Sequence, residues 1–175
     1  AAFCRKEVSL SSIDQSLPGL ELPLVPGPVF FELTLDGKPR HKGRHRSRIV
    51  QPRGKKPFIH NYPDPETEAF EKTLATAARL KMRSRPPSEK PLVLLVIADR
   101  EVPASWSKKE RQAALDARIL PTGKPDWDNH GKITDALNGI VWRDDAQVID
   151  ARVIKRFHAR PALTIVVREY VEQRG

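Results

Sequence analysis

The chain has 175 residues, with 31 lysines and arginines against 22 aspartates and glutamates, and a formal net charge of +9. Its longest apolar run, at residues 92–98, is too short to span a membrane as a helix, which takes about 20 residues. The single cysteine, Cys4, excludes an internal disulfide and a cysteine-based zinc site, and no secretory signal is expected. These features predict an intracellular, cytoplasmic protein with a polyanionic partner, most often nucleic acid.

Residues 1–28 are predicted to form a flexible tail, because they hold four prolines within eleven residues, from Pro18 to Pro28. The remainder, residues 29–175, is predicted to form one domain. Its first strand is expected at residues 29–35, where apolar and other side chains alternate. The Asp36-Gly37 pair that follows is typical of a turn.

A basic segment follows this turn, with nine lysines and arginines and no acidic residue between Lys38 and Lys56. Up to Arg48 the basic residues mostly occupy every second position, so on an extended strand they would share one face and could follow a phosphate backbone. A mobile, solvated loop is the alternative, although a block of one charge sign repels itself without a partner. The predicted DNA-binding residues are Lys38, Arg40, Lys42, Arg44, Arg46 and Arg48.

Two helices have clear start signals. Asp64-Pro65-Glu66 combines an N-cap, a first-turn proline and an acidic residue at the positive end of the helix dipole, and predicts a helix to about Met82. Its inward residues are predicted to be Phe70, Leu74, Ala77 and Ala78. Ser107 and Glu110 form a capping-box pattern, which predicts a second helix to about Arg118.

Three further strands are expected. The continuous apolar run at residues 92–98 is typical of a central strand buried on both faces. Residues 151–157 and 162–170 are predicted to form two more strands joined by a short loop. The order of elements predicts a single α+β domain with a mixed β-sheet and packed helices.

The acidic residues concentrate between the second helix and these last strands. Asp126 and Asp128 are two residues apart, so in extended backbone their carboxylates would point the same way and Trp127 would point toward the core. A helix is expected from Asn129 to a C-cap at Asn138-Gly139. Residues 140–142 are predicted to form an apolar strand that leads to the last aspartates. The five aspartates of this stretch are Asp126, Asp128, Asp135, Asp144 and Asp145.

Carboxylates that converge repel one another unless a cation lies among them. Oxygen ligands, without cysteine or a histidine pair at zinc spacing, indicate a hard cation, Mg²⁺ or Mn²⁺. Simpler interpretations exist: Asp128 or Asn129 could be only a helix N-cap, and Lys132 could be an ordinary i,i+4 partner of Asp128. A calcium loop is disfavoured, because Leu137 stands where the bidentate glutamate should be.

Together these segments resemble the RusA-type Holliday-junction resolvases of bacteria and their phages, and the resemblance covers roughly residues 29–170. It is carried by KPDWDN (124–129), Lys132, DALNG (135–139) and WRDDAQV (142–148), with support from GKPRHKGRHR (37–46) and PASWSKKER (103–111).

The resemblance implies a RusA-like fold and a homodimeric, Mg²⁺-dependent endonuclease that cuts four-way DNA junctions in recombination and repair, encoded by a bacterium or a phage. Asp126, Asp128 and Asp145 would bind the metal and be catalytic, and Lys132 would be the catalytic lysine. Two alternatives stay open: a nuclease of the same fold that cuts flaps or other branched DNA, and a basic DNA-binding protein without activity.

Asp144 and Asp145 are expected to play different roles, because adjacent side chains of an extended segment point to opposite faces. Asp145 is in phase with Val141 and would face the metal, whereas Asp144 is in phase with Trp142. Asp144 is therefore expected to accept backbone hydrogen bonds or to pair with a basic side chain. A turn or bulge there would remove this distinction.

Overall fold

The computed structural model describes residues 24–43, 46–62 and 64–172. Most of the predicted tail and the predicted DNA-binding residue Arg44 lie outside the described residues. Strand β1 (Leu24–Asp36) begins before the predicted position, so residues 24–28 belong to the sheet. Pro26 and Pro28 fit there because β1 is an edge strand, interrupted by irregular register between Pro26 and Phe31.

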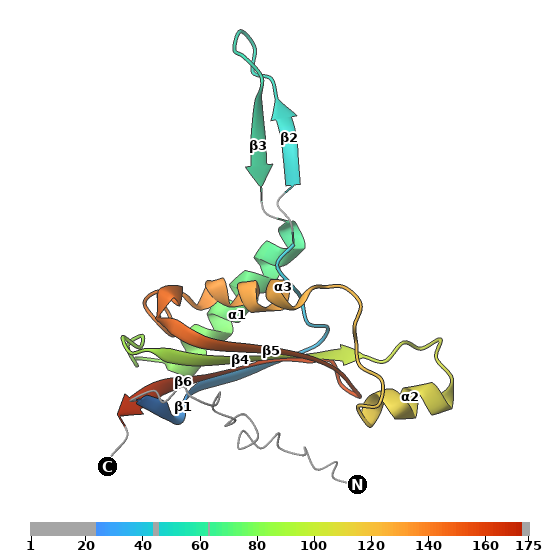
Figure 1. The fold of residues 1–175 in the computed structure, drawn as a ribbon. Helices are drawn as coiled ribbons and strands as arrows, with labels where there is room; N and C mark the ends of the chain where they lie inside the picture. The colour runs from blue at the N-terminus through green and yellow to red at the C-terminus, as the bar shows by residue number, and fades with distance from the viewer. Residues whose placement is uncertain (1–23, 44–45, 63, 173–175) are drawn as a thin grey trace.

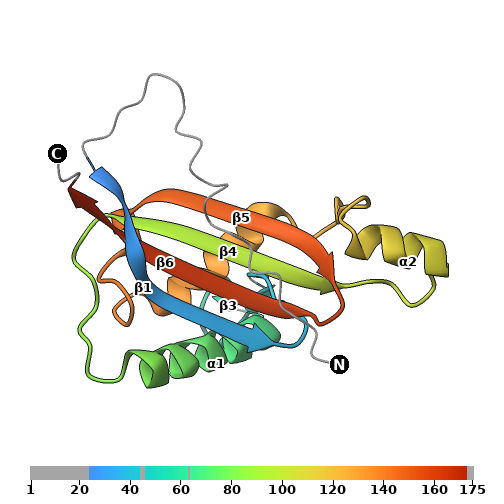
Figure 2. The same cartoon turned by 90° about the horizontal axis from the view of Figure 1, so that it is seen from below.

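The main sheet has four strands in the order β1-β6-β4-β5 (Figure 2). Its other members are β4 (Leu92–Glu101), β5 (Val148–His158) and β6 (Ala162–Glu172). Strands β4 and β5 are parallel, and the remaining pairs are antiparallel. The predicted α+β fold with a mixed sheet is confirmed, and the three predicted strands in its centre and C-terminal part are present.

Helices α1 (Pro65–Met82) and α3 (Trp127–Gly131) lie on the same face of the sheet (Figure 1). A 3₁₀ helix, η2 (Lys132–Leu137), continues α3 without a break. Apolar side chains from α1, η2, the turn after η2 and the sheet form a buried core, including Leu74, Ala78, Ile133, Leu137 and Trp142. This core fixes α3 and η2 above β4 and β5, which is what positions the acidic stretch.

The two predicted helix starts at Asp64 and Ser107 are confirmed, whereas the third helix begins at Trp127, two residues before the predicted Asn129. The Asp64 carboxylate accepts a hydrogen bond from Thr67 N at 3.2 Å, which caps α1. Ser107 and Glu110 form both halves of the capping box of α2 (Lys108–Leu115), which ends three residues before the predicted end. No helix in the described ranges is long and apolar enough to cross a membrane.

Two short strands, β2 (Arg46–Val50) and β3 (Phe58–Tyr62), form an antiparallel hairpin that pairs with no other strand. It stands away from the sheet beyond the N-terminal end of α1 (Figure 1). The single extended face considered for the basic residues from Lys38 to Arg48 is not present, because residues 38–43 have no strand structure. The basic segment is therefore divided between an irregular stretch on the body and the hairpin.

Candidate active site

The acidic stretch begins at α3, on the face of the sheet that α1 and α3 cover. Asp126 is the N-cap residue of α3 and has extended backbone, whereas Asp128 already lies in its first turn. The prediction that Asp126, Trp127 and Asp128 form an extended segment with Trp127 in the core is therefore wrong. Trp127 begins the helix and has 63% of its surface exposed.

The buried stripe of this segment starts later, at His130. His130, Ile133, Thr134 and Leu137 are all buried, and their spacing of three and four residues is that of one helical face. Asp128 and Lys132 lie on the more exposed side of the same stretch. The expected end of the helix is confirmed in part, because Gly139 has a φ of 71° just after the last helical residues.

Four charged side chains from the acidic stretch line one pocket of about 270 Å³, here called the carboxylate pocket. The four are Asp128, Lys132, Asp135 and Asp145. They come from α3, η2 and the 3₁₀ helix η3 (Asp145–Gln147), and β5 closes the other side with Arg152. Three residues of the predicted catalytic set thus share a pocket, whereas Asp126 is not part of its lining.

Asp128 and Lys132 form an ion pair, with Lys132 Nζ 2.8 Å from Asp128 Oδ2. The hydrogen bond from Lys132 holds the pKa of the Asp128 carboxyl below its usual value. The ordinary i,i+4 pairing considered for Lys132 is thus present. It keeps the carboxylate ionised and holds the ammonium group over the pocket.

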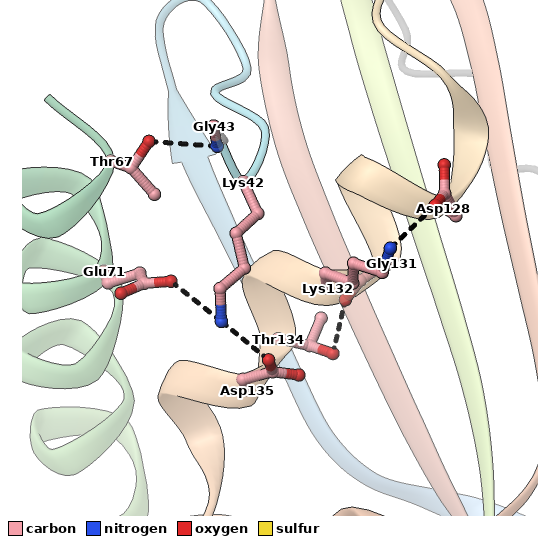
Figure 3. A network of polar contacts seen from close by, with 9 residues as sticks. All are labelled: Lys42, Gly43, Thr67, Glu71, Asp128, Gly131, Lys132, Thr134 and Asp135. Atoms are coloured by element: carbon pink, nitrogen blue, oxygen red, sulfur yellow. Dashed lines mark hydrogen bonds and ion pairs between the residues drawn. The ribbon is translucent and has the colours of Figure 1, made fainter. Parts of the chain in front are cut away.

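Lys42 lies on the body and not on an extended basic face (Figure 3). Its Nζ is 2.7 Å from Asp135 Oδ2 and 3.6 Å from Glu71 Oε1, and its backbone N donates to Asn129 O at 2.9 Å. Burial lowers the pKa of Lys42, but the hydrogen bonds and negative charges of Asp135 and Glu71 together outweigh burial, and the net pKa is raised. Lys42 therefore links α1, α3 and η2 and neutralises Asp135.

The loop before β5 is held by Gln147. Its Nε2 donates to the carbonyls of Ser88 and Lys90, each at 3.0 Å, and its Oε1 accepts from the backbone N of Arg143 and Asp144. All four hydrogen-bonding positions of the amide are used. Gln147 therefore fixes the backbone on which Asp145 stands.

The predicted strand at residues 140–142 is replaced by turns, with Trp142 making isolated bridges to Ser88 and Asn138. Alternation therefore does not distinguish the last two aspartates, but their environments do. Asp144 Oδ1 accepts from Ala146 N at 2.8 Å, which confirms the expected backbone hydrogen bond. Asp145 begins η3 and its side chain lines the carboxylate pocket.

Asp126 and Asp145 differ from the other acidic residues of the stretch. Within residues 24–43, 46–62 and 64–172, neither carboxylate makes a side-chain hydrogen bond or an ion pair. Both are exposed, so their oxygens are open to an external cation. In the same described residues no three histidine, cysteine, aspartate or glutamate side chains gather as a formed metal site. The donor chemistry of the pocket, ionised carboxylate oxygens, fits a hard cation.

Two pocket residues were not predicted from the sequence. The sequence indicates Asp135 only as one of five clustered aspartates, although its place three residues after Lys132 puts both on one helical side. Arg152 lies in β5 and reaches the pocket from the sheet. Its position depends on how α3 packs against β5, for which the local sequence holds no signal.

His130 is buried beneath this surface with 1% of its area exposed, and neither ring nitrogen makes a hydrogen bond of good geometry to any residue that the structure describes. Burial lowers the pKa of His130 to about 4, although the Arg40 backbone opposes the shift. The nearby charges of His41, Lys155 and Arg100 lower it further. The imidazole is therefore neutral at pH 7.

A pocket that combines carboxylates with lysine and arginine, on a strongly basic chain, is typical of hydrolases that act on nucleic acids. The family model described as Endodeoxyribonuclease RusA matches residues 36–168. The chain is also 32% identical over 144 residues to the protein named "Uncharacterized protein YqaN" of Bacillus subtilis (strain 168). That alignment covers 79% of this chain and 96% of the relative. The chain belongs to the RusA endodeoxyribonuclease family, which confirms the predicted family and the nuclease class.

Proposed function

We propose that this chain is a Mg²⁺-dependent endonuclease that cuts branched DNA, foremost four-way Holliday junctions, by phosphodiester hydrolysis. The observation that carries the proposal is the carboxylate pocket, in which Asp128, Lys132 and Asp145 meet in a member of the RusA family. Hydrolysis would leave 5′-phosphate and 3′-hydroxyl ends, and the process served would be recombination and repair inside a bacterial cell.

The metal ligands in this proposal are Asp126, Asp128 and Asp145, with Mn²⁺ as a possible substitute for Mg²⁺. When bound, the cation supplies Lewis acidity that polarises the scissile phosphodiester and lowers the pKa of an attacking water. Their assignment is supported by the Asp126 and Asp145 carboxylates, which have no partner within the described part of the chain, and by the lowered pKa that keeps Asp128 ionised. Neighbouring carboxylates favour cation binding, because it relieves their mutual repulsion.

Lys132 is proposed to stabilise the negative charge that develops on the phosphate. Its side chain is 57% exposed, so the ammonium group can reach a substrate oxygen while Asp128 orients it. Arg152, on the opposite wall of the pocket, is placed to contact a neighbouring phosphate. These cations make the pocket a place where a phosphate group and the carboxylates can lie side by side.

The basic segment is proposed to bind the DNA backbone through Lys38, Arg40, Lys42, Arg44, Arg46 and Arg48. The contacts of the described members indicate unequal shares. Lys42 is neutralised by Asp135, and Arg40 pairs with Glu66, so each would have to exchange a protein partner for a phosphate. We therefore expect the larger electrostatic contribution from cations that form no ion pair with any of the described residues, such as Lys38 and Arg48.

The active form is proposed to be a homodimer. A four-way junction needs two symmetric cuts, and a two-fold dimer presents two carboxylate pockets in matching orientation. Sedimentation at assay concentrations measures this directly. Paired cleavage by a strictly monomeric protein would contradict the dimer.

The test of the function is cleavage of a fixed four-way junction, compared with a duplex and a flap of matched sequence. We expect the junction to be cut in Mg²⁺ and left intact in EDTA. Asp126→Asn should keep junction binding and lose cleavage, while Asp116→Asn, on the surface after α2, serves as the matched control. Cutting by Asp126→Asn at the parent rate would contradict the metal assignment, and preferred cutting of the flap would identify the alternative nuclease.

A further inference from the structure

The β2–β3 hairpin keeps large apolar side chains in solvent. Its register places Ile49 opposite Ile59, and these side chains are 75% and 68% exposed. Phe58, at the start of β3, is 50% exposed. A lone two-stranded hairpin has no core and is marginally stable by itself. An apolar pair retained on such an element indicates a surface that is covered when a partner binds.

The opposite face of the hairpin has a different chemistry. Because side chains alternate along a strand, Arg48, His60 and Tyr62 lie on the face that Ile49 and Ile59 do not occupy. The Arg48 guanidinium lies 6.0 Å from the centre of the Tyr62 ring, and His60 stacks on Tyr62 with ring centres 6.2 Å apart. This face therefore presents cations and aromatic rings together.

The connecting turn of the hairpin adds charge of the same sign. Arg53, Lys55 and Lys56 lie in the turn and are exposed. The sequence holds no acidic residue between Asp36 and Asp64, so nothing within the hairpin neutralises these cations. The partner must therefore be strongly negative as well as able to accept apolar contact.

A groove of DNA meets both requirements and also encloses a ribbon from more than one side. The major groove admits a two-stranded β-ribbon between its phosphate walls. Apolar side chains such as isoleucine can wedge against base steps, and aromatic rings can stack on unpaired bases. The flat surface of a protein partner would cover one face of the hairpin and leave the other in water.

We propose that the β2–β3 hairpin is an arm that enters a groove of DNA beside a branch point. The turn cations contact phosphates, and the Ile49–Ile59 pair packs against base and sugar edges. Wedging costs least where base pairs are already unstacked, so this pair favours branched DNA over duplex. The choice of branched DNA rests on the proposed function, whereas the contact between the arm and DNA does not.

The test measures binding of a four-way junction and of a matched duplex across a salt series without divalent metal. One variant, Ile49→Ser with Ile59→Ser, removes the apolar pair; its control is Leu80→Ser, which changes a side chain 73% exposed on α1. A second variant, Lys55→Gln with Lys56→Gln, removes turn charge. Its control is Lys108→Gln with Lys109→Gln on α2, on the far side of the molecule in Figure 1.

The isoleucine variant is expected to bind the junction about tenfold more weakly and the duplex almost as before, so that the junction preference falls. The turn variant is expected to flatten the plot of log K against log salt by about 0.9 per lost phosphate contact on both DNAs. Neither control should change either quantity.

The proposal would be overturned if both variants behave like the parent. That means an unchanged junction preference for the isoleucine variant and an unchanged salt slope for the turn variant. So would an isoleucine variant that loses self-association but keeps its DNA affinity, because the hairpin would then contact a second copy of the chain. Arm-dependent binding of a junction that is never cut would contradict the proposed function alone.

Discussion

The buried imidazole of His130 should make the stability of the protein depend on pH between about 4 and 6.5. At pH 7 the imidazole is neutral in the folded and the unfolded chain. Below its usual pKa of 6.5 the unfolded chain gains a proton, whereas the folded chain resists protonation down to about 4 because the ring is buried. Unfolding is therefore favoured progressively as the pH falls through this window.

The expected loss follows from the size of the shift. One pKa unit corresponds to about 1.4 kcal/mol, so the free energy of unfolding should fall by about 3 kcal/mol between pH 7 and pH 4. The carboxyl groups with lowered pKa, such as Asp128 and Glu169, also lose stabilising interactions in acid, but at a lower pH than the histidine. Most of the change between about pH 6.5 and pH 5 is therefore expected from His130.

The measurement is urea unfolding of the parent and of His130→Leu at pH 7, 6, 5 and 4.5. His130→Leu should lose less stability across the series, and at pH 7 it should be at least as stable, because two unpaired ring nitrogens leave the core. His158→Leu, at an exposed site, is the matched control. Equal pH dependence of the parent and His130→Leu would refute the assignment of the titration to His130.

Three further outcomes are expected. Gln147→Met should lower the free energy of unfolding by about 2 to 4 kcal/mol in urea titrations, because four hydrogen bonds to backbone are lost, and should slow junction cutting more than junction binding. Lys42→Met should lower the free energy of unfolding by about 1 kcal/mol, because the ion pair with Asp135 is lost. It should change the salt slope of DNA binding by less than the slope expected for one phosphate contact. A larger change would mean that Lys42 leaves Asp135 to contact DNA. In single-turnover assays Asp145→Asn should abolish cutting. Asp144→Asn should reduce cutting only partly, because an asparagine at this position still accepts the hydrogen bond from Ala146 N. The reverse pattern would exclude Asp145 as the metal ligand.

The elements predicted correctly are those whose signals are local. The start of α1 is determined by Asp64 and Pro65, which act within the first turn. The burial of β4 follows from an uninterrupted apolar run that only a two-sided environment accommodates. Both signals depend on the residues themselves and not on distant partners, so the sequence is sufficient to predict them.

The error at Trp127 has a physical cause. Two aspartates flanking an apolar residue are typical of a strand. The residues that follow form helical turns instead, which bury His130, Ile133 and Leu137 on one face. The sequence predicts this helix from Asn129, but α3 begins two residues earlier, at Trp127. Helix formation by this stripe then turned Trp127 outward.

The position of Asp145 depends on contacts that are remote in the sequence. Gln147 reaches the carbonyls of Ser88 and Lys90, which come from the segment before β4. Neither the DDAQ segment nor its neighbours reveal these acceptors. Family resemblance assigns Asp145 to the site. Residue alternation also favours Asp145, but it assumes a strand at residues 140–142, which the structure does not contain.

The positions of the charges explain how a basic chain can hold several carboxylates close together. Asp128 and Asp135 are neutralised by Lys132 and Lys42, so they cost the fold little, while Asp145 stays open in the same pocket. Positive charge without an acidic residue nearby in the sequence lies elsewhere, on the β2–β3 hairpin. If the pocket provides the chemistry and the hairpin provides the affinity, variants of the pocket should change the cutting rate while Kd stays constant. Variants of the hairpin should change Kd and its salt slope, while bound DNA is cut at an unchanged rate. Proportional changes in both quantities for either class of variant would show that the two surfaces act as one.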